Sequence, residues 1–304
     1  MRHLGSPGVP KRISAIVTAY HPDERLLAVI EAARAACVEV LVVDNTPDGS
    51  PLLAGELPDG ARVLRSSKNL GLAGALNLGW RSLSPDCDAV LLLDQDSVVP
   101  EQLVTQLAAH LDTPSVGAVA PSPWDAERGS YIDPRTTLRP DVADRDAVMT
   151  SGLIVRRSLL DKLGGFREDF FVDCVDHDFC LRLRRAGYRI VQDKRVRLPH
   201  SLGDLREHRF LIGHVRVTHH PTWRLYWVVR NGVVLVRENL AAKPVWSLTS
   251  ILIMVRWAML TALYERPRGK RLTAMWRGLQ DGVTGRTDRR FLPAGASVGD
   301  VIDA

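Results

Sequence analysis

Two aspartates separated by one residue, Asp94 and Asp96, follow a run of apolar residues in the stretch AVLLLDQDSVVP. The run has the composition of a strand covered on both faces, as in a parallel sheet, and the carboxyl ends of such strands bind ligands. Two carboxylates crowded there repel each other unless a cation stabilises them. The pattern predicts a site for Mg²⁺ or Mn²⁺, and a solvated turn without metal is the alternative. Zinc is not favoured, because no cysteines or paired histidines have ligand spacing.

Two further residues follow strand-like stretches. Asp44 ends VEVLVVDN, so it should line the same crevice as Asp94 if both strands belong to one parallel sheet. The alternative is that Asp44 only opens the turn DNTPDGS. His200 follows RVRLPH, and its imidazole completes the metal site if that strand lies beside the one that ends at Asp94.

Three acids surround a predicted helix start in DCVDHDFCLR, namely Asp173, Asp176 and Asp178. The helix dipole favours one or two acids there without any function. Three within six residues exceed what capping needs, and a carboxylate beside an acceptor hydroxyl can serve as a general base. Asn69 and Gly71 precede a second helix, whose free amides can meet phosphate or ribose oxygens. Close packing of small residues is the alternative there.

Strand-like and helical patterns alternate over the first half of the chain, from ISAIVTAY and DERLLAVIEAARAAC to AVLLLD and PEQLVTQLAAHL. This order predicts an α/β fold with a mostly parallel sheet flanked by helices. Residues 116–145 are rich in turn formers and predict a loop with short strands. Beyond about Leu205 the pattern is helical and amphipathic, which predicts an appended C-terminal helical region.

The composition limits the partners and the compartment. The chain has 304 residues, a formal charge of +5 and a pI near 9.2, which suit anionic partners. Basic and aromatic residues are not interleaved on a reading platform, so a nucleic-acid binder is not favoured. Four scattered cysteines suggest reduced thiols, and residues 1–12 suggest a flexible tail without a signal peptide. We therefore expect a cytoplasmic protein.

One apolar stretch, Trp246 to Tyr264, approaches the length of a membrane span but carries Arg256 in its middle. This favours a helix that lies in the membrane interface or packs within the protein over one that crosses the bilayer. A homodimer contact is the other interpretation of the C-terminal region.

The motifs together resemble one enzyme family. The stretches TAY, VVDNTPDGS, NLGLAGALNLG, LLLDQDS, TSGLIVRRSLLDKLGGF, VDHDFCLRLRRAGY and LPHSLGD are similar in sequence and order to the family 2 glycosyltransferases of the GT-A fold. The resemblance covers roughly residues 13–205. LDQDS and HHPTWRLYWVVRNG also resemble the bacterial rhamnosyltransferase branch, which uses dTDP-rhamnose to build polysaccharides.

The resemblance implies a role for each matching position. It divides the chain into the tail 1–12, a nucleotide-sugar-binding and catalytic domain 13–205 and a helical region 206–304 that is membrane-proximal or dimerising. The metal ligands would be Asp96 and His200. Residues implied to bind the nucleotide sugar are Thr18, Tyr20, Asp44, Asn69, Gly71, Asp94 and Gln95.

For catalysis, the family run E-D-x-D corresponds to residues 175–178, with Val175 in place of the glutamate. Asp176 is the expected base, and Asp173 and Asp178 are the alternatives. Arg230 and Asn231 are candidates for acceptor or diphosphate contact on the resemblance alone.

The expected reaction is a metal-dependent, inverting transfer of L-rhamnose from dTDP-β-L-rhamnose to a hydroxyl of a glycan or lipid-linked glycan, at the inner face of the plasma membrane. Two alternatives keep the fold: a transferase for UDP-galactofuranose or another UDP sugar, and a noncatalytic sugar-nucleotide-binding subunit.

Overall fold

The computed structural model describes residues 10, 12–55, 57, 60–200, 205–209 and 214–298. The predicted tail, residues 1–12, lies almost wholly outside these residues. The chain divides into two compact units. We call residues up to 168 together with 175–200 the α/β unit. We call residues 169–174 together with those from 201 onward the helical unit.

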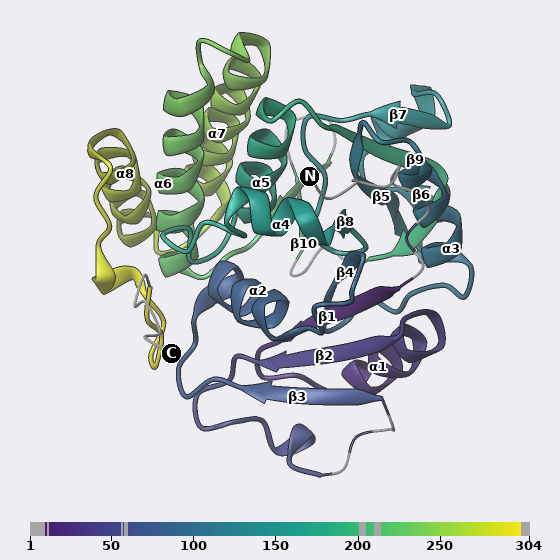
Figure 1. The fold of residues 1–304 in the computed structure, drawn as a ribbon. Helices are drawn as coiled ribbons and strands as arrows, with labels where there is room; N and C mark the ends of the chain where they lie inside the picture. Colours follow the sequence, from purple (N-terminus) through teal and green to yellow (C-terminus); the bar gives the residue numbers. More distant parts are fainter. Residues whose placement is uncertain are drawn as a thin grey trace. The chain divides into compact units, whose positions relative to one another are not determined.

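Within the described residues, the α/β unit contains one mixed sheet of nine strands in the order β3-β2-β1-β4-β8-β5-β9-β7, with β6 paired to β5 (Figure 1). β1, β2, β3 and β4 pair in parallel, and β5 pairs in parallel with β9. β8 is antiparallel to both β4 and β5, so these two run the same way and their carboxyl ends meet at one edge. The prediction of an α/β fold with a mostly parallel sheet is confirmed. The strands are β1 Ile13–Ala19, β2 Glu39–Asp44, β3 Ala61–Arg65, β4 Ala89–Asp94, β5 Val116–Asp125, β6 Ser130–Tyr131, β7 Val142–Asp144, β8 Ile154–Arg156 and β9 Arg189–Pro199.

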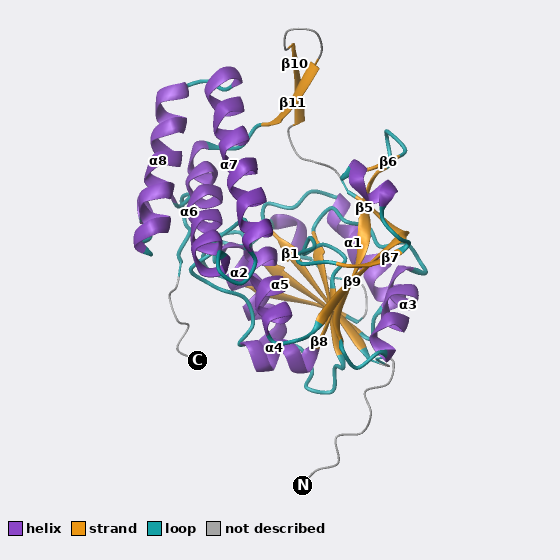
Figure 2. Cartoon of the chain, turned by 90° about the horizontal axis from the view of Figure 1, so that it is seen from above, coloured by secondary structure: helices purple, strands orange, loops and turns teal. Residues whose placement is uncertain are grey.

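Helices cover both faces of this sheet (Figure 2). Successive residues of a strand point to opposite faces, so Ala15 and Val17 of β1 pack in one core with α1 and α3. Ile16 faces α2, where a methyl group added at Gly79 would lie 2.8 Å from its side chain. Because these strands are buried on both faces, their sequences are continuous apolar runs. The helices of the unit are α1 Arg25–Ala36, α2 Gly71–Ser82, α3 Leu103–Ala108, α4 Arg157–Leu163 and α5 Val175–Arg185.

The loop predicted over residues 116–145 is wrong for its first ten residues, which form β5 in the interior of the sheet. Pro121 and Pro123 hide this strand in the sequence, because proline cannot donate to a ladder of hydrogen bonds. The structure accommodates them at an irregularity, where the register with β9 shifts between Pro121 and Ser122.

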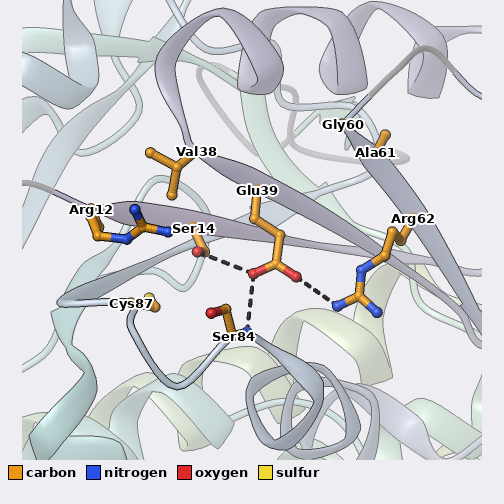
Figure 3. A pocket seen from close by; sticks show the side chains of 9 residues that line it. All are labelled: Arg12, Ser14, Val38, Glu39, Gly60, Ala61, Arg62, Ser84 and Cys87. Carbon is orange, nitrogen blue, oxygen red and sulfur yellow. Dashed lines mark hydrogen bonds and ion pairs between the residues drawn. The ribbon is translucent and has the colours of Figure 1, made fainter.

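A cavity of about 360 Å³ opens at the amino ends of β1, β2 and β3 (Figure 3). Glu39 lies in it and accepts hydrogen bonds from the Ser14 hydroxyl, the Ser84 amide and the Arg62 guanidinium. This cavity is at the opposite ends of the strands from Asp44 and Asp94, so it is separate from the predicted nucleotide crevice.

The described part of the helical unit contains a two-stranded antiparallel sheet and three long helices. The C-terminal helical region was predicted, but its two strands were not, and the helical interpretation is wrong for residues 205–209 and 214–218. Aromatic residues form its core, where Phe171 packs with Tyr226 and Trp227. The elements are β10 Leu205–Arg209, β11 His214–Thr218, α6 Thr222–Asn239, α7 Pro244–Tyr264 and α8 Arg268–Thr284.

α8 approaches α6 closely through two glycines one turn apart. A methyl group added at Gly278 would lie 2.5 Å from the Tyr226 carbonyl oxygen, and one at Gly282 would lie 2.8 Å from that of Arg230. Side chains at these positions would force the helices apart, so glycine fixes α6 against α8.

α7 leaves most of its apolar residues at the surface, and within it only Ser247 and Thr261 are buried. Judged by length and composition alone, α7 is long and apolar enough to cross a membrane. Arg256, in its middle, is exposed. Six of its exposed apolar residues are spaced so that they lie along one side of the helix, while Ile253 is exposed off that side; the six are Val245, Leu248, Leu252, Val255, Met259 and Leu263.

Candidate functional site

The carboxyl edge of the sheet collects the predicted metal ligands. Asp94 ends β4, Asp96 follows two residues later, and His200 follows the last residue of β9. One ligand atom from each lies within 4.8 Å of the others. Two carboxylates and an imidazole provide oxygen and nitrogen donors, so this group is a candidate site for a divalent cation.

His200 reaches this group although its strand is not beside β4. The sequence analysis expected His200 to complete the metal site only if its strand lay directly beside the strand that ends at Asp94. In the sheet, however, β8 and β5 separate β4 from β9. β9 continues along β5 beyond the register shift and pairs Pro199 with Trp124. The His200 amide then donates to the Trp124 carbonyl at 3.0 Å, which fixes the residue at the carboxyl edge.

Asp94 is the electrostatic centre of the edge. Burial raises the pKa of its carboxyl to about 6, His200 opposes this rise, and the negative charges of Asp96 and Asp176 add to it. The charge of Asp176 therefore acts on the Asp94 carboxyl, which places Asp176 within electrostatic reach of it. A cation bound here would replace the proton and relieve the repulsion between the acids, which is the physical reason that the residues fit one.

Gln95 connects the ends of β1 and β4. Its side-chain oxygen accepts a hydrogen bond of 2.7 Å from the Tyr20 amide, and Tyr20 is 38% exposed next to it. Thr18 is half-buried at the end of β1. These residues lie at the expected edge, and the prediction that they bind the nucleotide sugar stays a prediction.

Asp44 is fully buried and organises the turn after β2. Its two carboxylate oxygens accept from the Thr46 amide at 3.1 Å and from the Ser50 amide at 2.7 Å. The turn-forming role is therefore present in the structure. These two bonds use two of about four acceptor positions of the carboxylate, and the predicted contact with the nucleoside stays a prediction.

Asn69 and Gly71 form part of a polar network at the start of α2. The Asn69 side-chain oxygen accepts from the Gly71 amide and from the side-chain amide of Asn45, both at 2.9 Å. Gly71 has a φ of +71°, a conformation that glycine adopts without strain. The network fixes the backbone at the helix entry where the sequence predicts ribose and diphosphate contacts.

Asp176, at the start of α5, is hydrogen-bonded to the residue that follows it. Its Oδ1 accepts from the His177 amide and lies 2.8 Å from the His177 Nδ1. Burial alone would raise the pKa of this carboxyl, but the charge and hydrogen bonds of His177 outweigh burial and hold the pKa below its ordinary value. Asp176 is therefore ionised at neutral pH, as a general base must be.

The other two acids of this stretch are held by arginines. Asp178 is 3% exposed and lies 2.7 Å from the Nε of Arg182, whose remaining nitrogens donate to backbone carbonyls. Asp173 accepts two hydrogen bonds of 2.8 Å from Arg224. These pairs occupy both carboxylates, and the prediction that Asp176 is the base stays a prediction.

Arg230 and Asn231 are buried in the helical unit, with exposures of 2% and 0%. Arg230 donates to the carbonyl and the carboxylate of Asp169. Asn231 donates to the carbonyls of Val172 and Asp173 at 2.8 and 3.0 Å. In this structure both residues bind protein groups, and their predicted contact with acceptor or diphosphate stays a prediction.

Two residues of the site were not assigned a role from the sequence. Ser151 accepts a hydrogen bond from the Asp94 amide at 3.4 Å, because the antiparallel β8 brings the preceding turn to the carboxyl edge. His177 is the partner of Asp176. Ser151 belongs to the stretch TSG, which is part of the resemblance to the family, but no role was predicted for it.

Solved structures share this fold. Staphylococcus aureus TarS matches with a TM-score of 0.59 and 14% identity over 91% of this chain and 50% of TarS. A crystal structure of GalNAc-T7 with UDP, GalNAc and Mn²⁺ matches with a TM-score of 0.50 and 13% identity over 62% of this chain and 43% of that one. This chain spans half or less of either length. The fold is therefore GT-A-like.

The chain belongs to glycosyl transferase family 2, whose model matches residues 14–189. Among curated relatives, dTDP-rhamnosyl transferase RfbF of Shigella flexneri is 26% identical over 243 residues, covering 75% of this chain and 80% of the relative. An N-acetylglucosaminyl-diphospho-decaprenol L-rhamnosyltransferase of Mycobacterium tuberculosis is 27% identical over 280 residues, covering 73% and 91%. The resemblance predicted from the motifs is thereby confirmed.

Proposed function

We propose that the protein transfers L-rhamnose from dTDP-β-L-rhamnose to a hydroxyl of a glycan acceptor, with inversion at the anomeric carbon. The observation that carries the proposal is the group of Asp94, Asp96 and His200 at the carboxyl edge, with Asp176 in electrostatic reach. Family membership supports a nucleotide-sugar donor. The names of the two relatives, which share about a quarter of their residues with this chain, support rhamnose as the sugar.

The donor would lie along the carboxyl edge of the sheet. Thr18, Tyr20 and Asp44 would bind the nucleoside, with the Asp44 carboxylate accepting the thymine N3–H. Asn69 and Gly71 would lie by the ribose and diphosphate, with Asp94 and Gln95 beside them. Asp96 and His200 would hold Mg²⁺ or Mn²⁺, as the Mn²⁺ and UDP named with GalNAc-T7 suggest for this fold. The cation would supply Lewis-acid stabilisation of the departing diphosphate.

Asp176 would be the base. Its ionised carboxylate takes the proton of the acceptor hydroxyl while that oxygen forms a bond to the anomeric carbon. The bond from this carbon to the diphosphate oxygen breaks, and its electron pair leaves with the nucleoside diphosphate. Attack from the face opposite the leaving group converts a β-L-rhamnosyl donor into an α-L-rhamnoside.

The acceptor would be a lipid-linked glycan, reached from the cytoplasmic side of the plasma membrane. The name of the mycobacterial relative includes a decaprenol-linked sugar, which supports this class of acceptor. The row of exposed apolar residues on α7 suits the headgroup boundary. Residues 243–284 contain seven basic and two acidic residues. Glu265 is buried and Asp281 accepts from the Tyr226 hydroxyl, so the excess of basic charge favours anionic lipid.

Vesicle sedimentation tests the membrane part. We expect the protein to pellet with phosphatidylglycerol vesicles at low salt and much less with phosphatidylcholine vesicles. A variant with Leu248→Glu and Leu252→Glu should stay in solution. The matched control is Leu138→Glu, an 89% exposed leucine of the α/β unit, which should pellet like the unchanged protein. If the unchanged protein is a dimer without vesicles and the α7 variant is a monomer, this side of α7 is a dimer contact instead.

Donor binding tests the proposed sugar. Calorimetry would compare dTDP-rhamnose, UDP-galactofuranose, UDP-glucose and GDP-mannose, each with Mn²⁺ and with chelator. We expect Mn²⁺-dependent binding of dTDP-rhamnose alone. Preference for a UDP sugar would keep the fold and the mechanism but overturn the rhamnosyl assignment. No binding of any donor would favour a noncatalytic role.

A further inference from the structure

The segment directly before α5 has an unusual backbone. Asp173 and Cys174 both have a φ of +61°, in the left-handed region that residues other than glycine rarely adopt. α5 begins at the next residue, Val175, and Asp176 is its second residue. The conformation at positions 173 and 174 therefore sets the direction in which the chain enters the helix that carries the proposed base. Strained backbone of this kind persists only where surrounding groups hold it.

The groups that hold this segment belong to α6. Arg224 forms a two-pronged ion pair with the Asp173 side chain. About two helical turns further on, the buried Asn231 donates to the carbonyls of Val172 and Asp173. Arg230 binds Asp169 at the start of the segment. α6 thus fixes the side chain and the carbonyl of the first strained residue at the same time.

α6 is itself held rigidly at this point. Gly278 and Gly282 of α8 lie against the α6 backbone at Tyr226 and Arg230, between the two residues that bind Asp173. The Arg230 guanidinium also donates to the carbonyl of Arg286 and to the hydroxyl of Thr287. A rigid helix can maintain a strained neighbour, whereas a loosely packed one would yield to it.

We propose that Arg224 is a positioning residue for the transfer reaction: its ion pair with Asp173, supported by Asn231, maintains the left-handed backbone that orients Asp176. Asp173 is then an anchor and not a base. The inference rests on the proposed function in one respect, namely that Asp176 accepts the proton.

Steady-state kinetics of Arg224→Gln, Asp173→Asn and the double variant test the proposal. Asparagine is chosen at position 173 because it tolerates a positive φ. Each single variant should lose about tenfold in kcat, with the donor dissociation constant unchanged within twofold. The double variant should lose about the same tenfold and not a hundredfold, because residues that act as a unit are not additive. Arg224→Lys keeps the positive charge and one hydrogen bond to Asp173, so its loss in kcat should be smaller.

The matched control is Arg290→Gln. Arg290 also forms a two-pronged pair, with Asp288 of the helical unit, but is 78% exposed and distant in sequence from residues 169–174. Its kcat should not change. A loss in Asp173→Asn as deep as that in Asp176→Asn, with Arg224→Gln nearly active, would make Asp173 the base. Normal kcat in Arg224→Gln, or losses that multiply in the double variant, would also overturn the proposal.

A second measurement does not depend on transfer activity. Hydrogen exchange of the peptide that covers residues 169–176 should be faster in Arg224→Gln than in the unchanged protein, and unchanged in Arg290→Gln. Equal protection in all three would overturn the positioning role. If the unchanged protein transfers no sugar but exchange responds as expected, the proposed function fails while the structural clamp stands, so the two failures are distinguishable.

Discussion

The two units of the molecule distribute charge and apolar surface in opposite ways. In the α/β unit the apolar side chains of the sheet are buried, and acids gather at one edge, where burial and mutual repulsion raise the pKa of Asp94. In the helical unit a buried arginine and asparagine bind backbone groups, while apolar side chains of α7 remain exposed. The acids at the sheet edge lack enough opposite charge to balance them, which is typical of a ligand-binding site. The buried Arg230 of the helical unit is paired with protein groups, which is typical of a structural role.

Replacement of the proposed base should have the largest effect. Asp176→Asn is expected to lower kcat by a hundredfold or more with donor affinity nearly unchanged, because the proton acceptor is lost and the donor contacts are not. Since the pKa of Asp176 lies below its ordinary value, the carboxylate stays ionised as pH falls from 8 to 5. The activity of the unchanged protein should then show no loss from this group across that range.

The neighbouring acid provides the contrast. Asp178→Asn removes a buried partner of Arg182, so it should lower the melting temperature while the remaining folded enzyme keeps most of its kcat. If Asp178→Asn, and not Asp176→Asn, abolishes turnover in folded protein, the base has been assigned to the wrong carboxylate.

Removal of a metal ligand should affect donor binding next. Asp96→Ala takes away one of the three ligand groups, and we expect the gain in donor affinity on adding Mn²⁺ to fall from tenfold or more to less than twofold. Calorimetry with Mn²⁺ and with chelator measures it, and the chelator arm is the internal control. The same Mn²⁺-dependent gain in Asp96→Ala and in the unchanged protein would remove this site from donor binding.

Packing of the helical unit can be tested at two positions of α8, where replacing glycine with alanine should change the free energy of unfolding in opposite directions. Gly278→Ala places a methyl group against the Tyr226 carbonyl, and overpacking of this kind costs about 1–3 kcal/mol. At Gly269 nothing lies within 4 Å of an added methyl group, so Gly269→Ala should stabilise the helix by up to about 1 kcal/mol. Thermal unfolding distinguishes them, and equal effects would contradict the close approach of α8 to α6.

The sequence predicted the site better than the support around it. The βαβ order placed Asp44 and Asp94 at one edge, because parallel strands end together. The sequence analysis missed β5, because this strand contains two prolines. It also did not predict that His200 would reach the site from a strand separated from β4 by two others. The positive φ values at 173 and 174 and the approach of Gly278 to α6 leave no periodic signal, since they depend on residues more than fifty positions apart.

The smallest expected effect concerns the pH dependence of stability at the sheet edge. Asp94 has a pKa of about 6 in the folded protein without metal, against about 3.9 in an unfolded chain. Between these values the folded state retains a proton that the unfolded state releases. The unfolding free energy contributed by this group therefore falls as pH rises from 4 to 6, and the loss is complete above pH 6.

A bound cation replaces that proton, so Mn²⁺ should raise the melting temperature more at pH 7.5 than at pH 5, by roughly 2–4 °C. Asp94→Asn carries no charge to compensate, so without metal it should melt above the unchanged protein at pH 7.5, and Mn²⁺ should stabilise it less. Thermal unfolding of both proteins at the two pH values measures this. If Asp94→Asn melts lower at pH 7.5 without metal, the carboxylate is compensated by the protein itself, and the contrast between an unbalanced sheet edge and a balanced helical unit does not hold.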